Sequence, residues 1–71
     1  MSKARAKKLA TELRRSSFFY GVNGFGKEAR LLVRADALRE LAAIRNAGGF
    51  FDSAETIDAA TLDATEAILR S

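Results

Sequence analysis

Apolar residues recur at helical spacing along most of this 71-residue chain. Between Lys27 and Ala47 they form two stripes whose members lie three or four residues apart. The two stripes are Leu31, Ala35, Leu38 and Ala42, and Val33, Ala37, Leu41 and Ile44. A helix with one apolar stripe packs on one surface, so two adjoining stripes predict a central helix with a neighbour on each side.

A second amphipathic segment begins near Ser2 and ends near Arg15. Its apolar positions have the i, i+3, i+4, i+7 spacing of one buried helix face: Ala6, Leu9, Ala10 and Leu13. Six basic side chains share the rest of its circumference: Lys3, Arg5, Lys7, Lys8, Arg14 and Arg15. Such a face fits an anion, either nucleic acid or an acidic protein, and it equally fits a helix surface that water alone covers. The six residues are therefore candidates for nucleic-acid or anion binding.

Aromatic residues and glycines gather between these two helices, in the segment from Ser16 to Gly26. The pair Asn23-Gly24 indicates a turn, either within a loop or at the tip of a tight hairpin. We expect a loop, because the residues after it favour helix. Its aromatic side chains either fill the small core or contact a partner. The candidate partner-binding residues here are Phe18, Phe19, Tyr20 and Phe25.

The segment from Gly21 to Lys27 has the G-x-x-x-x-G-K spacing of a phosphate-binding loop. Glu28, however, stands where that loop needs a Ser or Thr hydroxyl to ligate magnesium. A carboxylate at this position would repel phosphate, and the chain is too short for the rest of a nucleotide-hydrolysing domain. We therefore do not expect this segment to bind or hydrolyse a nucleotide.

The pair Gly48-Gly49 predicts the end of the central helix. Asp52 and Ser53 then offer an N-cap, and Asp52 has capping-box spacing to Glu55, so we expect a third helix from about Ala54 to Arg70. Its predicted buried face is Ile57, Ala60 or Thr61, Ala64 and Ile68. Leu62 and Leu69 lie off that face. They are either an accident of composition or a contact with a partner or a second copy, and we count both as candidate partner-binding residues.

These elements predict an all-α fold, one compact three-helix domain that spans residues 1–71. The chain has no cysteine and no histidine, which removes disulfides, the commonest metal ligand and the commonest general base. The acidic residues follow neither a calcium-loop pattern nor a paired catalytic arrangement. We therefore expect a protein that is not an enzyme and that binds neither a cofactor nor a metal ion.

Charge is divided unevenly between the two ends of the chain. Residues 1–15 carry a net charge of +5 and residues 46–71 a net charge of −4, while the whole chain carries +3. No apolar run approaches the length of a membrane span, and no apolar signal-peptide core follows the basic start. These features predict a cytoplasmic protein without a membrane partner, in a bacterial host.

The segment from Asp36 to Ile57 resembles the helix–glycine–helix section of ribbon–helix–helix proteins, which include plasmid antitoxins. The matching positions are Leu38, Leu41, Gly49, Phe51, Ser53, Glu55 and Ile57. The resemblance implies a dimer in which a short strand before the first helix pairs with its equivalent and contacts the DNA major groove. Residues Arg30 to Arg34 would be that strand, although they lack polar–apolar alternation and suit a helix better.

Two functions follow from these observations. We expect a small non-enzymatic protein-binding module of the kind that phages or mobile elements encode. It would be an inhibitor or modulator that occludes a larger host protein, in an anti-CRISPR-like or transcription-modulating role. The alternative is a dimeric nucleic-acid-binding regulator, either ribbon–helix–helix-like or acting through its basic first helix. The sequence leaves open whether the chain forms a homodimer.

Overall fold

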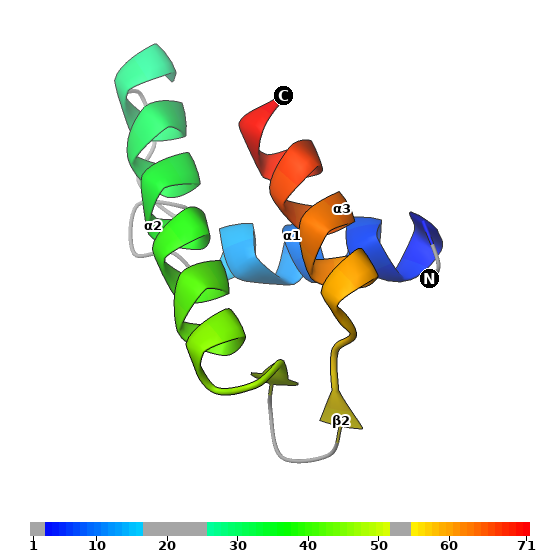
Figure 1. Ribbon diagram of the computed structural model, residues 1–71. Coiled ribbons are helices and arrows are strands. Elements are labelled where there is room, and N and C mark those ends of the chain that lie inside the picture. The colour runs from blue at the N-terminus through cyan, green and yellow to red at the C-terminus, as the bar shows by residue number, and fades with distance from the viewer. Residues whose placement is uncertain (1–2, 17–25, 52–54) are drawn as a thin grey trace.

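The computed structural model describes residues 3–16, 26–51 and 55–71, and within them the chain forms three helices and one short hairpin (Figure 1). The helices are α1 (Lys3–Arg15), α2 (Gly26–Asn46) and α3 (Ala59–Arg70). The hairpin joins β1 (Phe50–Phe51) to β2 (Glu55–Thr56) and lies between α2 and α3. The predicted all-α fold of three helices is confirmed.

Helix α1 uses the predicted face. Its four buried residues are Ala6, Leu9, Ala10 and Leu13. This face leaves no alternative, because charged or polar residues hold nearly every other position of the helix. Leu9, Ala10 and Leu13 join the main core cluster, to which α2 contributes Ala37, Leu41 and Ile44.

Helix α2 ends at the two predicted glycines. Gly48 and Gly49 have φ angles of 77° and 90°, which only glycine adopts readily. The Gly49 amide donates to the carbonyl oxygen of Ile44 at 2.8 Å, and the Gly48 amide donates to that of Arg45 at 3.1 Å. This pair of bonds is a Schellman motif, which satisfies carbonyl groups that the helix end would otherwise leave without donors.

The chain then forms a hairpin where we expected the third helix to begin. β1 and β2 are antiparallel, with Phe50 opposite Thr56 and Phe51 opposite Glu55. Phe51 packs against the core, whereas Phe50 remains 52% exposed. Helix α3 begins only at Ala59, with Asp58 as its N-cap, so the predicted start at Ala54 and the predicted cap at Asp52 or Ser53 are wrong. Pairing of β2 with β1 takes Glu55 into a strand, which prevents a capping box there.

The predicted buried face of α3 is also wrong in part. Leu62 and Leu69 are only 3% and 1% exposed and belong to the core, so neither is a surface leucine. The buried residues of α3 are Thr61, Leu62, Thr65 and Leu69. Of the predicted face, Thr61 is buried, Ala64 and Ile68 are half-buried, and the alternative Ala60 is exposed. The helix is turned about its axis relative to the prediction, so that it can pack against two neighbours. Ile57, just before the helix, is buried as predicted.

All three helices contact one another, and α1 and α3 make the most extensive contact. In Figure 1 α1 passes behind α3, and α2 runs beside both. Small buried side chains allow α1 and α3 to approach closely: Ala6 and Ala10 on α1, and Thr61 and Thr65 on α3. The Thr65 hydroxyl donates to the carbonyl oxygen of Thr61 at 2.7 Å, so its burial leaves no unpaired polar atom.

Helix α2 packs on both other helices, but only one of its two predicted stripes is buried. Ala37, Leu41 and Ile44 lie in the core, and Val33 is half-buried. In the other stripe Leu31, Ala35 and Ala42 are exposed and only Leu38 is half-buried. The expectation that both stripes are covered is therefore wrong for the chain in the absence of a partner. Residues Arg30 to Arg34 are helical, so the strand of a ribbon–helix–helix protein is not formed there.

Candidate functional site

The first half of α2 carries two neighbouring exposed leucines. Leu31 is 57% exposed and Leu32 is 46% exposed, and among the described residues only Phe50 is a comparably exposed large apolar side chain. Helix length accounts for this exposure. At about 1.5 Å per residue, the 21 residues of α2 extend about 31 Å, against about 18 Å for the 12 residues of α3. In Figure 1 the first turns of α2 extend past the level of α1.

Arginines surround the two leucines. Arg30, Arg34 and Arg39 are all exposed on the same part of α2. Arg39 forms an ion pair with Asp36, with 2.7 Å between Nη1 and Oδ1. Within the part of the chain that the structure describes, Arg30 and Arg34 take part in no ion pair. The exposed leucines thus share this part of α2 with two arginines outside any such pair, and Arg34 in particular is available to a partner's carboxylate.

The second half of the exposed stripe leads into a groove between α2 and α3. Leu38 and Ala42 line its α2 side, and Glu66 and Arg70 line its α3 side. Apolar surface on α2 therefore continues from the projecting turns down to the junction of the two helices. The groove is small, but it extends the same stripe by two further residues.

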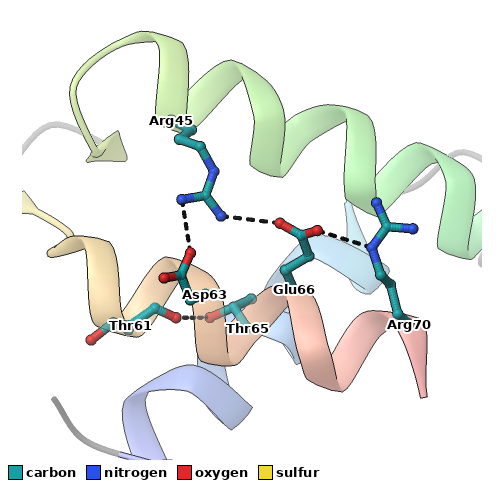
Figure 2. Close-up of polar contacts among 6 residues, drawn as sticks. All are labelled: Arg45, Thr61, Asp63, Thr65, Glu66 and Arg70. Atoms are coloured by element: carbon teal, nitrogen blue, oxygen red, sulfur yellow. Dashed lines mark hydrogen bonds and ion pairs between the residues drawn. The ribbon is translucent and has the colours of Figure 1, made fainter.

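A network of charged side chains holds this groove together (Figure 2). Arg45 of α2 contacts two carboxylates of α3: Nη1 lies 3.1 Å from Oδ1 of Asp63, and Nη2 lies 3.1 Å from Oε1 of Glu66. Glu66 also accepts a hydrogen bond from Nε of Arg70 at 2.9 Å. The Arg70 bond is the main cause that lowers the pKa of Glu66 below its ordinary 4.5, and Arg45 adds to the effect. Such exposed pairs add little stability. The two Arg45 contacts connect α2 to α3, whereas the Arg70 contact lies within α3.

The six basic residues predicted on the first helix divide into two groups. Lys3, Lys7, Lys8 and Arg15 are exposed. Arg5 and Arg14 are half-buried, and each donates from Nη2 to a backbone carbonyl oxygen of another element at 3.4 Å. The acceptors are Thr56 of β2 and Ile68 of α3. These two arginines therefore connect α1 to its neighbours, and the four exposed residues form the basic face of α1.

The structure describes only two of the six predicted partner-binding residues. Phe18, Phe19, Tyr20 and Phe25 lie outside the described residues. Leu62 and Leu69 are core residues and offer no surface. Sequence reasoning identified the stripe that begins at Leu31 but assigned it to a buried contact, and it overlooked Leu32 and Arg34. The signal that could have found them is the length of this helix, which exceeds that of either predicted neighbour.

Neither a metal centre nor a membrane span is found in the described part of the chain. Residues 3–16, 26–51 and 55–71 contain no group of three or more acidic, histidine or cysteine side chains placed to hold a metal ion. None of the described helices is both long enough and apolar enough to cross a bilayer. Asp58, the N-cap of α3, has a pKa below its ordinary 3.8, mainly through the Thr61 side chain. That shift reflects a helix start and not a buried acid.

Comparison with known proteins adds no relative. No protein-family model, curated protein or solved structure matches this chain. The function proposed below therefore rests on the chain's own surfaces.

Proposed function

We propose that this chain is a small non-enzymatic protein-binding module that uses the exposed face of α2 to cover a surface of a larger protein. The observation that carries the proposal is the adjacent exposure of Leu31 and Leu32 among arginines. Burial of a leucine side chain is favourable by about 1.5–3 kcal/mol, so a pair held in water is a source of binding free energy. Arginine is enriched at protein interfaces, and the buried centre of an interface is more apolar than the rest of the surface.

The fold suits a role in occlusion. The core of α2 is complete without Leu31 and Leu32, so a partner can bury them without unfolding the domain. A module of this size that binds through one helix would act by covering the partner's working surface. Inhibition of a larger protein, or modulation of a transcription complex, is the form of activity that this mode of binding supports.

The test compares two sets of exposed apolar side chains. The wild-type chain, the double variant Leu31→Ala/Leu32→Ala and the control Phe50→Ala are immobilised and exposed to a nuclease-treated bacterial lysate. Each captured protein is identified, purified and titrated against the three chains. We expect the double variant to lose at least about tenfold in affinity, as for truncated interface anchors, and Phe50→Ala to retain wild-type affinity.

Phe50→Ala is a matched control because Phe50 is about as exposed as the two leucines but lies on the hairpin. Circular dichroism must show equal helix content in the three chains. If the double variant binds every captured protein as tightly as the wild type, the exposed face of α2 is not the binding surface and the proposal is wrong.

A second candidate function rests on the basic face of α1. Lys3, Lys7, Lys8 and Arg15 are exposed, and within the described residues none of them is in an ion pair. Lys3 and Lys7, one helical turn apart, suit contacts with successive phosphates of a nucleic acid. Under this candidate the chain is a nucleic-acid-binding regulator that uses α1.

A further inference from the structure

The exposed stripe of α2 has the spacing of a coiled-coil seam. Leu31, Ala35, Leu38 and Ala42 follow one another at intervals of four, three and four residues. This is the alternation of heptad positions d and a, with leucine at each d and alanine at each a. This spacing of 3.5 residues, kept over nearly two heptads, places the four side chains on one face, where a second helix can pack along them. We call these four residues the α2 seam.

Among the described residues, no helix buries Leu31, Ala35 or Ala42 of this seam. Leu31, Ala35 and Ala42 are exposed, while Leu38 packs partly on the core and lines the groove beside α3. The buried stripe of α2 already contacts α1 and α3. The seam is thus a second apolar face on a helix whose first face is already used, and its length of about three helical turns matches a short helix.

The charges beside the seam disfavour a second copy of this chain as its occupant. Arg34 and Arg39 hold heptad positions g and e, which flank the seam. In a parallel pair, position g faces position e five residues further along the other helix, so Arg34 would face Arg39 of the second copy. In an antiparallel pair with the whole seam in register, Arg34 would face Leu41 and Arg39 would face Leu32 of the second copy. The parallel arrangement places like charges together, which is unfavourable, and the antiparallel arrangement offers Arg34 no carboxylate.

The same charges favour an acidic helix. Arg39 already has Asp36 as a partner at 2.7 Å, whereas Arg34 has no ion pair among the described residues. A carboxylate at the facing position of a partner helix would pair with Arg34. At the other end the next d position is Arg45, which is already paired with Asp63 and Glu66, so the apolar seam ends there.

We propose that the α2 seam is a docking site for an amphipathic helix of a partner protein, with apolar residues at heptad spacing and carboxylates at the flanking positions. This inference rests on the proposed protein-binding function and specifies its partner. Leucine and alanine side chains of the seam supply the apolar contact, and Arg34 selects the acidic flank.

The test uses two synthetic three-heptad peptides with the same leucine and alanine seam. One has glutamate at every e and g position and the other has lysine. Each is labelled with a fluorophore, and its anisotropy is followed while the purified full-length chain is added, at low and at physiological ionic strength. We expect the glutamate peptide to bind roughly fivefold or more tightly than the lysine peptide. The reason is that two flanking charge contacts are attractive with the glutamate peptide and repulsive with the lysine peptide.

Three variants make the result specific. Arg34→Glu should reverse the preference between the peptides, whereas Lys7→Glu, the same charge change on α1, should preserve it. Leu31→Ala should weaken binding of both peptides about tenfold. Equal binding of the two peptides, no binding of either, or the same effect from Lys7→Glu as from Arg34→Glu would overturn the inference.

This outcome is separable from that of the proposed function. If captured proteins depend on Leu31 and Leu32 but neither peptide binds, the chain is a protein-binding module whose partner is not an acidic helix. If capture is independent of the two leucines, the proposed function itself fails, whatever the peptides do.

Discussion

The amide of Ile57 donates to the carbonyl oxygen of Gly49 at 2.7 Å, and this bond closes the chain between α2 and α3. The two residues are so close that a side chain at Gly49 would overlap the carbonyl oxygen of Ile57. The contact places the hairpin against the end of α2 and sets where α3 can begin. Gly49 is therefore the residue at which the chain between the two helices tolerates a side chain least.

We predict that Gly49→Ala destabilises the domain far more than Gly48→Ala. Both glycines have a positive φ, which costs an alanine about 1 kcal/mol. Only at Gly49 does the added carbon meet backbone atoms, while the space around Gly48 is open. Urea unfolding of both variants, followed by circular dichroism, measures the difference. Equal losses of unfolding free energy would show that the close approach of Gly49 and Ile57 does not constrain the fold.

We predict effects of very different size on stability from two leucine truncations. Leu69→Ala removes a residue that is 1% exposed in the core, and should lower the free energy of unfolding by about 2–5 kcal/mol or unfold this small domain. Leu31→Ala truncates a side chain that is 57% exposed, and should change it by no more than about 0.5 kcal/mol. The measurement is a pair of urea transitions. A large loss for Leu31→Ala would place Leu31 in the folding core of the isolated chain.

We predict that Glu66 contributes to acid sensitivity. Its hydrogen bond from Arg70, and then Arg45, hold its pKa below the ordinary 4.5 in the folded chain. A carboxyl whose pKa is lower in the folded state stabilises it above the unfolded-state pKa, and that stabilisation is lost as pH falls through the folded-state value. Thermal midpoints of the wild type and Glu66→Gln, measured from neutral pH to about pH 3, should converge on acidification.

Between neutral pH and about pH 3, the thermal midpoint of the wild type should fall further than that of Glu66→Gln. Glu66→Gln should still lose some, because Asp58 also has a lowered pKa. Arg70→Gln is the matched control, because it removes the hydrogen bond that is the main cause of the lowered Glu66 pKa but keeps the Glu66 carboxyl. An unchanged acid response in Glu66→Gln would mean that this carboxyl does not stabilise the fold.

The second candidate function predicts a specific salt dependence. If α1 binds nucleic acid, affinity should fall as salt rises. The logarithm of the binding constant should fall with the logarithm of the salt concentration, with a slope of about 0.9 per phosphate neutralised on duplex DNA. Lys7→Ala/Lys8→Ala should reduce that slope by about two, and Leu31→Ala/Leu32→Ala should leave it unchanged. Fluorescence anisotropy with a labelled duplex measures both. A slope that the double lysine variant does not alter would exclude these residues as phosphate ligands.

The sequence was sufficient for elements whose residues leave a single choice. The face of α1 was predicted residue by residue, because charges exclude the other arcs of that helix. The end of α2 was predicted from Gly48 and Gly49, because the chain needs positive φ angles to leave the helix there. In both places the local pattern and the tertiary structure favour the same answer.

The sequence was insufficient where several choices have similar local free energies. Helix α3 is rich in alanine and threonine, so arcs centred on Ile68 or on Leu69 are both apolar. Leu62 and Leu69 are the ones buried, because the helix packs against α1 and α2 together. Glu55 likewise fits a capping box or a strand, and pairing with β1 is a tertiary contact that no local pattern reveals. The candidate surface was missed for the same reason, since exposure of Leu31 depends on where the neighbouring helices end.

The measurement that tests the central claim most directly is site-specific photo-crosslinking within the captured complex. A photoreactive amino acid replaces Leu32 in one chain, Phe50 in a second and Lys7 in a third, so that the three exposed positions lie on α2, on the hairpin and on α1. The account predicts a covalent adduct with the partner from position 32 and none from positions 50 and 7. An adduct from position 7 or 50, with none from position 32, would contradict it.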